Sequence, residues 1–225
     1  MDEMKRAAAR AAVELVQDGM IVGLGTGSTA KHAVDAVGEK IRSGMKLICV
    51  PTSIATEAQA RSLQIPLKDL NEVSHLDLTI DGADEVDPDL QLVKGAGGAL
   101  FREKLVAMSS GKFLVVVDDS KLVERLGTRM PLPVEILQFG WQRTAERVIA
   151  VMGGGQVRMK NSAPFVSDNG GYILDCPVPN VPVRDLWLTL KKITGVVESG
   201  LFLDMTTVVF VAGKDGIKRL DPQAR

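Results

Sequence analysis

The chain has little cysteine, almost no net charge and no long apolar run, and each of these absences excludes a class of protein. The two cysteines, Cys49 and Cys176, have neither metal-ligand spacing nor the density of a disulfide framework. Because Cys49 lies within an apolar strand candidate, we expect a buried, reduced thiol there. The 27 basic and 28 acidic side chains leave a net charge of -1, so a nucleic-acid or anionic-membrane partner is not expected.

The length and composition are those of a cytoplasmic globular protein. No run approaches the ~20 apolar residues that a membrane span needs, and the N-terminus is charged and helical in pattern, unlike a signal peptide. Hydrophobic residues make up 45% and charged residues 24%, which is ordinary for a protein with a core. A chain of 225 residues predicts one large domain, or a domain that carries an insertion.

Strand and helix patterns alternate over the first half of the chain. Apolar runs at 20–24, 47–50, 76–80 and 113–117 predict strands, and the periodic segments 3–17, 29–42, 54–63 and 99–109 predict helices. This alternation favours a mostly parallel, doubly wound (Rossmann-like) α/β sheet that is covered on both faces.

The pattern changes after Arg129, where Pro131 and Pro133 punctuate the chain. Strands at 134–138, 156–160, 172–175 and 196–203, with helices at 141–152 and 183–193, give the order β-α-β-β-α-β of a ferredoxin-like unit. A hairpin turn is expected at 168–171, and the strand at 207–211 is expected to return to the first sheet. We therefore predict a Rossmann-like catalytic domain, 1–130 plus 206–225, with an inserted ferredoxin-like α+β domain, 131–205.

The segment 78–104 gathers acids, a lysine and glycines at the ends of two strand candidates. The first candidate ends at Asp81, with Asp84 close behind it, and the second ends at Lys94. A glycine-containing run, Gly95 to Gly98, then leads into a helix. Ligands bind beyond the carboxyl ends of strands in open α/β sheets, so we expect a binding site here.

Glu103 is the candidate general base of this segment. At 100° per residue it falls among Ala99, Leu100, Val106 and Ala107 on the helix. Such surroundings desolvate a carboxylate and raise its pKa, as a base that works near neutral pH requires. The alternative is a solvated helix residue that pairs with a neighbouring cation.

A glycine loop follows the first strand and has the spacing G-x-G-x-x-A from Gly25 to Ala30. The dinucleotide interpretation needs an acid at the end of the second strand, which is absent, and the P-loop interpretation needs a Gly-Lys-Ser/Thr sequence, also absent. The backbone of Gly25 and Gly27, the hydroxyls of Thr26, Ser28 and Thr29, and the helix dipole suit one phosphate monoester. A tight turn with a Ser/Thr cap explains the loop equally well.

Other polar residues near these strand ends give weaker indications. Lys121 follows the strand at 113–117 at the same sheet edge, although a surface lysine that begins a helix is the alternative. The carboxylates between Asp81 and Asp89 do not match the EF-hand pattern, so we predict no metal site. Asp87 and Asp89 flank a proline and are expected to be solvated turn residues. The two histidines, His32 and His75, are expected to be structural.

Taken together, these motifs resemble the type A ribose-5-phosphate isomerase family. The resemblance is carried by Gly25–Thr29, Asp81–Asp84, the run from Lys94 into Arg102-Glu103-Lys104, Ser120-Lys121, Pro131–Glu135 and Asp168–Gly171, and it covers essentially the whole chain. Each motif alone is weak, and their order and spacing make the match specific. Ala96 stands where many relatives carry glycine.

The resemblance implies that the chain interconverts D-ribose 5-phosphate and D-ribulose 5-phosphate without metal or organic cofactor. It implies that Glu103 moves a proton between C2 and C1 through a cis-enediolate. It implies substrate contacts from a set of four segments: Thr26, Gly27, Ser28 and Thr29; Asp81, Gly82, Ala83 and Asp84; Lys94, Gly95, Ala96 and Gly97; and Lys121. It also implies a cytoplasmic homodimer or homotetramer of the pentose phosphate pathway.

The residue chemistry fits these roles. Lys94 and the N–H groups after it can stabilise an enediolate, Asp81 can exchange a proton with a sugar oxygen during ring opening, and Asp84 can order a hydroxyl. Lys5, on the first helix, is a further candidate for the phosphate. Two alternatives stay open. One is a non-catalytic sugar-phosphate sensor of the same fold, which would usually need an output module that we do not expect in this sequence. The other is an acyl-CoA-linked transferase, for which the chain is short.

Overall fold

The structure is a computed structural model that describes residues 2–222, and the chain divides into two compact units. The first unit contains the residues up to Ala83, Arg102–Leu122 and the residues from Asp204 onward. The second contains Asp84–Phe101 and Val123–Leu203, so it takes in most of the predicted insertion and two further stretches. The domain limits at 131 and 205 therefore stay a proposal.

The first unit is built on a six-stranded sheet with the order β15-β14-β6-β3-β1-β2. Its strands are β1 (Ile21–Leu24), β2 (Ile48–Pro51), β3 (Leu78–Asp81), β6 (Phe113–Asp118), β14 (Val208–Gly213) and β15 (Gly216–Leu220). The first five are parallel neighbours, which confirms the predicted α/β class. The strand predicted at 207–211 returns to this sheet beside β6. The antiparallel edge strand β15 was not predicted.

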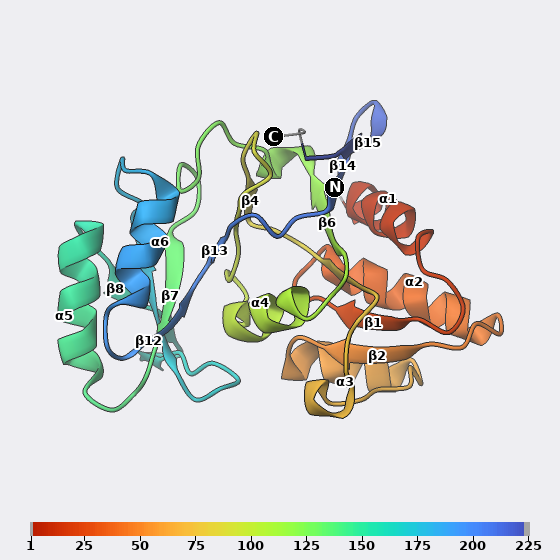
Figure 1. Cartoon of the computed structure of the whole chain (residues 1–225), viewed down its shortest axis with the longest axis horizontal. Helices are drawn as coiled ribbons and strands as arrows, with labels where there is room; N and C mark the ends of the chain where they lie inside the picture. The colour runs from red at the N-terminus through yellow and green to blue at the C-terminus, as the bar shows by residue number, and fades with distance from the viewer. Residues whose placement is uncertain (1, 223–225) are drawn as a thin grey trace. The chain divides into compact units, whose positions relative to one another are not determined.

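Helices cover both faces of this sheet. The helices of the first half are α1 (Asp2–Val13), α2 (Ala30–Arg42), α3 (Ile54–Ser62) and α4 (Leu100–Met108), and α1 and α2 lie side by side (Figure 1). Ala8, Ala9 and Ala12 of α1 are completely buried, because a single methyl group lets the helix approach β6 and β14 closely. Along β2, Cys49 packs in this large core, whereas the next residue, Val50, packs with Val106 of α4. Successive side chains of a strand point to opposite faces, so both faces are apolar.

The second unit contains a four-stranded antiparallel sheet with the order β12-β7-β11-β8. Its elements are β7 (Leu132–Ile136), α5 (Trp141–Met152), β8 (Gln156–Val157), β11 (Tyr172–Cys176), α6 (Val183–Lys191) and β12 (Val196–Ser199). Their order along the chain is the predicted β-α-β-β-α-β. Leu132, Val134 and Ile136 of β7 pack with Val148 of α5 and Leu186 of α6 in one apolar core.

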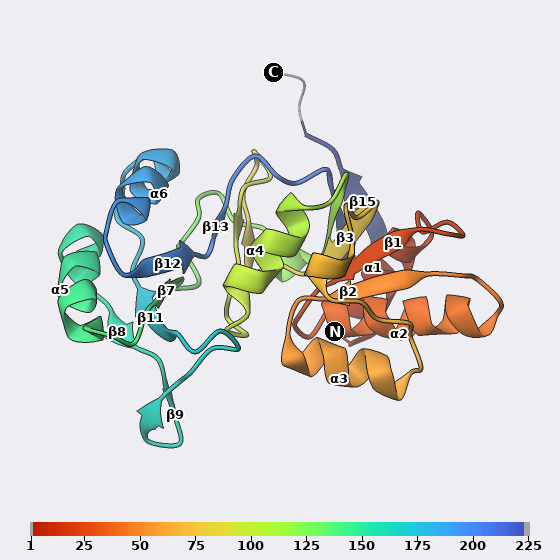
Figure 2. The same cartoon turned by 60° about the horizontal axis from the view of Figure 1, so that its bottom comes forward.

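The strand predicted at 156–160 is wrong in its extent. It stops after β8, and Arg158 separates it from a small hairpin, β9 (Met159–Lys160) and β10 (Ala163–Pro164), which extends beyond β8 (Figure 2). The hairpin turns at Asn161 and Ser162, whose φ values of 51° and 64° are uncommon for residues other than glycine. The turn expected at 168–171 is present, and it joins the bridge between Val166 and Tyr172.

A third sheet, β13-β5-β4, holds the backbone of Lys94. Its strands are β4 (Glu85–Val86), β5 (Leu92–Val93) and β13 (Leu201–Phe202). The single strand predicted at 196–203 breaks at Gly200, whose carbonyl accepts a hydrogen bond from the Lys94 N–H at 2.9 Å. A Cβ at Gly200 would collide with the Lys94 carbonyl oxygen, so only glycine allows this approach.

Candidate active site

In the first unit, the predicted site residues lie where parallel strands end. The glycine loop follows β1, Asp81 is the last residue of β3, and β6 leads into a short 3₁₀ helix, Asp119–Lys121, which contains Lys121. Because β6, β3 and β1 are parallel neighbours, their carboxyl ends share one edge of the sheet.

Asp81 fixes the glycine loop to the sheet. The side chain is completely buried, and Oδ1 accepts hydrogen bonds from the backbone N–H of Thr26 at 3.0 Å and of Gly82 at 2.7 Å. A Cβ at Gly25 would lie 2.5 Å from the Asp81 Cα and closer still to its carboxylate. The first glycine of the loop is therefore required by close packing against Asp81.

The Thr26 side chain anchors the loop to the start of α3. Its Oγ1 lies 2.8 Å from the hydroxyl oxygens of Thr52 and Ser53 and 3.1 Å from that of Thr56. Ser53 is also the N-cap of α3, where its hydroxyl accepts from the Thr56 N–H at 3.0 Å. These contacts give Thr26 a structural role, and its contact with a substrate stays a prediction. The three partners, which lie at or just before the start of α3, were not predicted from the sequence.

The remaining donors of the loop are arranged around the N-terminus of α2. Thr29 precedes the helix, and its side chain makes no capping hydrogen bond, so the cap explanation of the loop is not the arrangement observed. Lys5 of α1 donates from Nζ to the Ser28 hydroxyl at 2.9 Å. A lysine, two hydroxyls and a helix N-terminus suit a phosphate group.

Glu103 lies in the first turn of α4 and is only 4% exposed. The alternative of a solvated surface glutamate is therefore wrong. Leu100, Val106 and Ala107 on the same helix are buried as well, as the helical periodicity predicts. Lys104 is also buried, which the periodicity did not indicate. Burial disfavours an ionised carboxylate, so the upward pKa shift predicted for Glu103 stands as a prediction.

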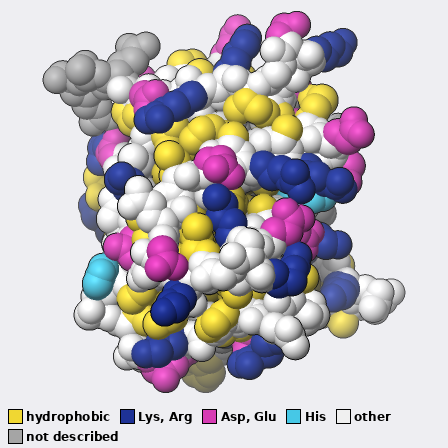
Figure 3. Space-filling model, turned by 90° about the vertical axis from the view of Figure 1, so that its right-hand side faces the viewer, with side chains coloured by type: hydrophobic (Ala, Val, Ile, Leu, Met, Phe, Trp, Pro, Cys, Tyr) yellow, Lys and Arg dark blue, Asp and Glu magenta, His cyan; other side chains and the backbone are white. Residues whose placement is uncertain are grey.

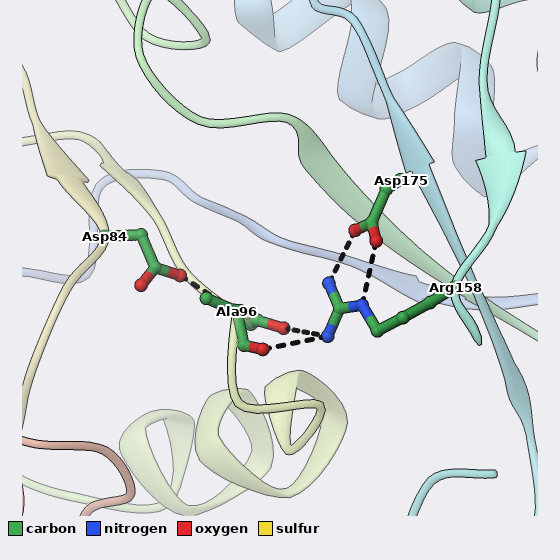
Figure 4. A network of polar contacts seen from close by, with 5 residues as sticks. Asp84, Ala96, Arg158 and Asp175 are labelled. Atoms are coloured by element: carbon green, nitrogen blue, oxygen red, sulfur yellow. Dashed lines mark hydrogen bonds and ion pairs between the residues drawn. The ribbon is translucent and has the colours of Figure 1, made fainter. Parts of the chain in front are cut away.

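In the second unit, Lys94 and the loop after it are held by backbone contacts. The Lys94 side chain is 2% exposed, and its Nζ lies 5.5 Å from the ring centroid of Phe202, within the range of a cation–π interaction. Asp84 Oδ2 accepts from the Ala96 N–H at 2.8 Å (Figure 4). Gly95 has φ +110°, which favours glycine, whereas Ala96 is accommodated without such a value.

The other carboxylates near Asp84 stabilise turns. Buried Glu85 accepts through Oε1 from the N–H groups of Arg129 at 2.6 Å and Met130 at 2.8 Å. Asp87 Oδ1 accepts from the N–H groups of Asp89 and Gln91, so Asp87 is a turn residue as predicted, but it is half-buried and not solvated. Burial raises the pKa of Asp87, and these two hydrogen bonds oppose the shift. Of the described residues, no three His, Cys, Asp or Glu side chains gather as metal ligands would.

The surface charges are mixed in sign on the face that Figure 3 shows. Lysine and arginine side chains alternate there with aspartates and glutamates, and apolar atoms lie between them.

His32, which was expected to be structural, forms a hydrogen bond between its Nε2 and Asp2 Oδ1 at 3.0 Å.

Comparisons with known proteins agree in one family. The family model described as ribose 5-phosphate isomerase A (phosphoriboisomerase A) matches residues 48–216. The ribose-5-phosphate isomerase A of Bacillus mycoides is 48% identical over 220 residues, which are 97% of this chain and 99% of that protein.

Solved structures give the same result. A D-ribose-5-phosphate isomerase in complex with phospho-erythronic acid superposes with a TM-score of 0.94 at 37% identity and covers 97% of this chain and 98% of its own. The ribose 5-phosphate isomerase of Plasmodium falciparum superposes with a TM-score of 0.93 at 41% identity and covers 100% of both chains.

Proposed function

The chain belongs to the ribose 5-phosphate isomerase A family, and we propose that it interconverts D-ribose 5-phosphate and D-ribulose 5-phosphate. The match extends over nearly all of the chain, with relatives of that name. The observation that carries the chemistry is the burial of Glu103, a carboxylate with 4% exposure at the start of a helix. A desolvated carboxylate is suited to take a proton from carbon near neutral pH.

The substrate is held by its phosphate. Ser28 and Thr29, with the N-terminus of α2 and the nearby Lys5, supply hydroxyl donors, a helix dipole and an ammonium group. The N–H of Gly27 completes the loop, and Lys121 binds a further oxygen of the sugar phosphate. Binding at the phosphate positions C1 and C2, which bear no charge of their own, against the reacting groups.

The reaction moves two protons within the substrate, one between carbons and one between oxygens, and no electrons leave the substrate. The Glu103 carboxylate takes the proton from C2 of the open-chain aldose, and the electron pair of that bond forms the C1=C2 double bond while O1 becomes an oxyanion. A proton passes from O2 to O1, and Glu103 returns its proton to C1, which leaves the carbonyl at C2. Lys94 and the N–H groups of Gly95 and Gly97 stabilise the oxyanion electrostatically, while the Ala96 N–H is held by Asp84.

The aspartates act before and around this step. Asp81 takes the proton of the anomeric hydroxyl and delivers one to the ring oxygen, so that the sugar opens. Asp84 orders a hydroxyl, and its bond to the Ala96 N–H also supports the loop. Gly82 and Ala83 present backbone groups between the two acids. No metal or organic cofactor takes part in this scheme.

The cellular setting follows from the same reaction. We place the enzyme in the pentose phosphate pathway of the cytoplasm, as a homodimer or homotetramer, with a small sugar phosphate as its ligand and no nucleic-acid or membrane partner. The chain's balanced charge supports the last point.

A coupled assay of ribulose 5-phosphate formation tests the proposal. The purified chain should convert ribose 5-phosphate in chelator-treated buffer, and a sensor or a CoA-dependent transferase would not. Binding of ribose 5-phosphate without turnover would identify the sugar-phosphate sensor instead.

A further inference from the structure

Arg158 binds the loop after Lys94 from a distant part of the sequence. Its Nη1 donates to the carbonyl oxygens of Gly95 at 3.0 Å and Ala96 at 2.9 Å. Its Nε and Nη2 donate to the two carboxylate oxygens of Asp175, with 2.8 Å for the Nε bond (Figure 4). A single guanidinium therefore joins β11 to two successive peptide groups. The two carbonyl groups belong to residues that lie 62 and 63 positions before Arg158 in the chain.

The guanidinium is itself held in place. Arg158 lies between β8 and β9, and its backbone N–H donates to the Ile173 carbonyl at 2.7 Å. Its side chain is 17% exposed and that of Asp175 is 19%, so the ion pair is largely shielded from water. The Arg158 Cζ lies 5.9 Å from the ring centroid of Phe165. The Phe165 ring also fills the space where a Cβ of Gly98 would lie. Bidentate geometry of this kind orients an arginine strongly.

The two carbonyl bonds determine which way the loop N–H groups point. In a planar trans peptide the C=O and N–H bonds point in opposite directions. Because the Gly95 carbonyl points at Arg158, the Ala96 N–H points away from Arg158. Asp84 Oδ2 accepts a hydrogen bond from this N–H at 2.8 Å. The Ala96 carbonyl also points at Arg158, so the N–H of Gly97 is turned away in the same sense.

We propose that Arg158, oriented by Asp175, is a positioning residue that sets the peptide planes of the Lys94–Gly97 loop for stabilising the reaction's oxyanion. This rests on the proposed isomerase function. Arg158 touches no reacting atom; it acts by keeping the loop donors preorganised, and preorganised donors are the ones that stabilise developing charge. The small antiparallel sheet of the second unit thereby contributes to the chemistry through one side chain.

Arg158→Lys is the variant that tests the proposal, because it keeps the charge but loses the planar fork that serves a carboxylate and two carbonyls together. We expect kcat to fall about 10- to 100-fold, as small misplacements of catalytic groups do. KM for ribose 5-phosphate and the inhibition constant of inorganic phosphate should change less than about 3-fold, because neither reports on oxyanion stabilisation. Inhibition by phospho-erythronic acid, whose carboxylate resembles the enediolate in charge, should weaken in parallel with kcat.

Hydrogen exchange gives a readout that needs no turnover. The Ala96 amide should exchange about 10-fold faster or more in Arg158→Lys, since the carbonyl bonds that orient its peptide group are lost. Arg143→Lys is the matched control: this arginine pairs with exposed Glu146 within α5, and all of these quantities should stay at the wild-type values. Asp175→Asn leaves Arg158 in place but removes its carboxylate partner, and we expect the same pattern more weakly. This second variant carries the test if Arg158→Lys does not fold.

Wild-type kcat and Ala96 exchange in Arg158→Lys would overturn the proposal. So would a loss of kcat matched by an equal weakening of inorganic phosphate binding, which would indicate general disorder. If the wild-type chain had no isomerase activity, the proposed function would fail, and the exchange of the Ala96 amide would still test whether Arg158 orders the loop.

Discussion

The Asp81 carboxylate and the Thr26 backbone are joined by a hydrogen bond of 3.0 Å, which ties the end of β3 to the loop after β1. A buried carboxylate of the proposed reaction therefore also supports the proposed phosphate loop. The contact depends on the absence of a side chain at Gly25, where a Cβ would meet the Asp81 Cα at 2.5 Å.

We expect Gly25→Ala to lower the free energy of unfolding by about 1–3 kcal/mol, the usual cost of overpacking. KM for ribose 5-phosphate should rise in the same variant, because the loop is displaced from Asp81. Urea unfolding and steady-state kinetics measure the two effects. Gly44→Ala is the control: its added Cβ meets nothing within 4 Å, so only its φ of +105° carries a cost, and KM should not change. An unchanged KM in Gly25→Ala would separate the loop from phosphate binding.

Thr29→Ala should raise KM for ribose 5-phosphate more than it lowers kcat. The Thr29 hydroxyl makes no capping bond, so its removal leaves the helix start intact while it deletes a phosphate donor. A rise of about 10-fold in KM corresponds to the loss of one hydrogen bond to a charged group. Inorganic phosphate should compete with the substrate in the wild type and less strongly in the variant. Thr189→Ala, whose hydroxyl bonds within α6, is the control. An effect confined to kcat would contradict the assignment.

The two thiols should be inert in the folded protein. Burial raises the pKa of Cys49 from 9.0 to about 12, and burial, with a smaller contribution from Asp175, raises that of Cys176 to about 12. The thiolate fraction at pH 8 is then about one in 10⁴, so reaction with a disulfide reagent should be very slow until the protein unfolds. Because the folded pKa is the higher one, both thiols favour folding below pH 9 and lose that effect as the pH rises toward 12. Rapid labelling of the native protein at pH 8 would be incompatible with this burial.

Activity should persist without added metal. The acids near Asp81 are engaged in holding backbone N–H groups, and Lys94 supplies the positive charge that an enediolate needs. Dialysis against EDTA should leave kcat unchanged, and Mg²⁺ should not raise it. Loss of activity on chelation with recovery on Mg²⁺ would overturn the expectation, and an apo sample that kept its circular dichroism spectrum would show that the loss was not unfolding.

The sequence predicted the elements whose patterns are local. The runs that became β1, β3 and β6 are apolar and followed by polar residues, and their parallel pairing places Gly25 and Asp81 at one edge without further information. Helical periodicity likewise predicted that Glu103 faces apolar neighbours, and it is buried.

What the sequence did not indicate depends on contacts between distant residues. The turn at Asn161 and Ser162 lacks glycine, so its local signal is weaker than that of the Asn-Gly turn at 169–170 and did not end the predicted strand. Gly200 interrupts a β-rich run because Lys94 approaches it, a contact across more than a hundred residues. Arg158 was missed for the same reason, since nothing near it in the sequence distinguishes it from a surface arginine.

Glu103→Gln is the most direct test of the proton transfer. Glutamine keeps the shape and hydrogen-bonding capacity of the side chain but cannot accept a proton from carbon. Removal of a general base typically costs about 10²- to 10⁴-fold in rate, so we expect kcat to fall by about 10²- to 10⁴-fold or more. Binding of inorganic phosphate should survive, because the loop from Gly25 to Thr29 is unchanged.

Two measurements separate loss of the base from loss of the fold. The first is steady-state inhibition by phosphate, which gives kcat together with the inhibition constant of phosphate. The second is exchange of the substrate C2 proton into D₂O, which reports the first proton transfer alone. Glu57→Gln is the matched control, since Glu57 forms an exposed ion pair with Arg61 and should leave both quantities unchanged. A Glu103→Gln protein that exchanged the C2 proton at the wild-type rate would remove Glu103 from the mechanism. Asp81, buried at the end of β3, would then be the remaining carboxylate to test as the base.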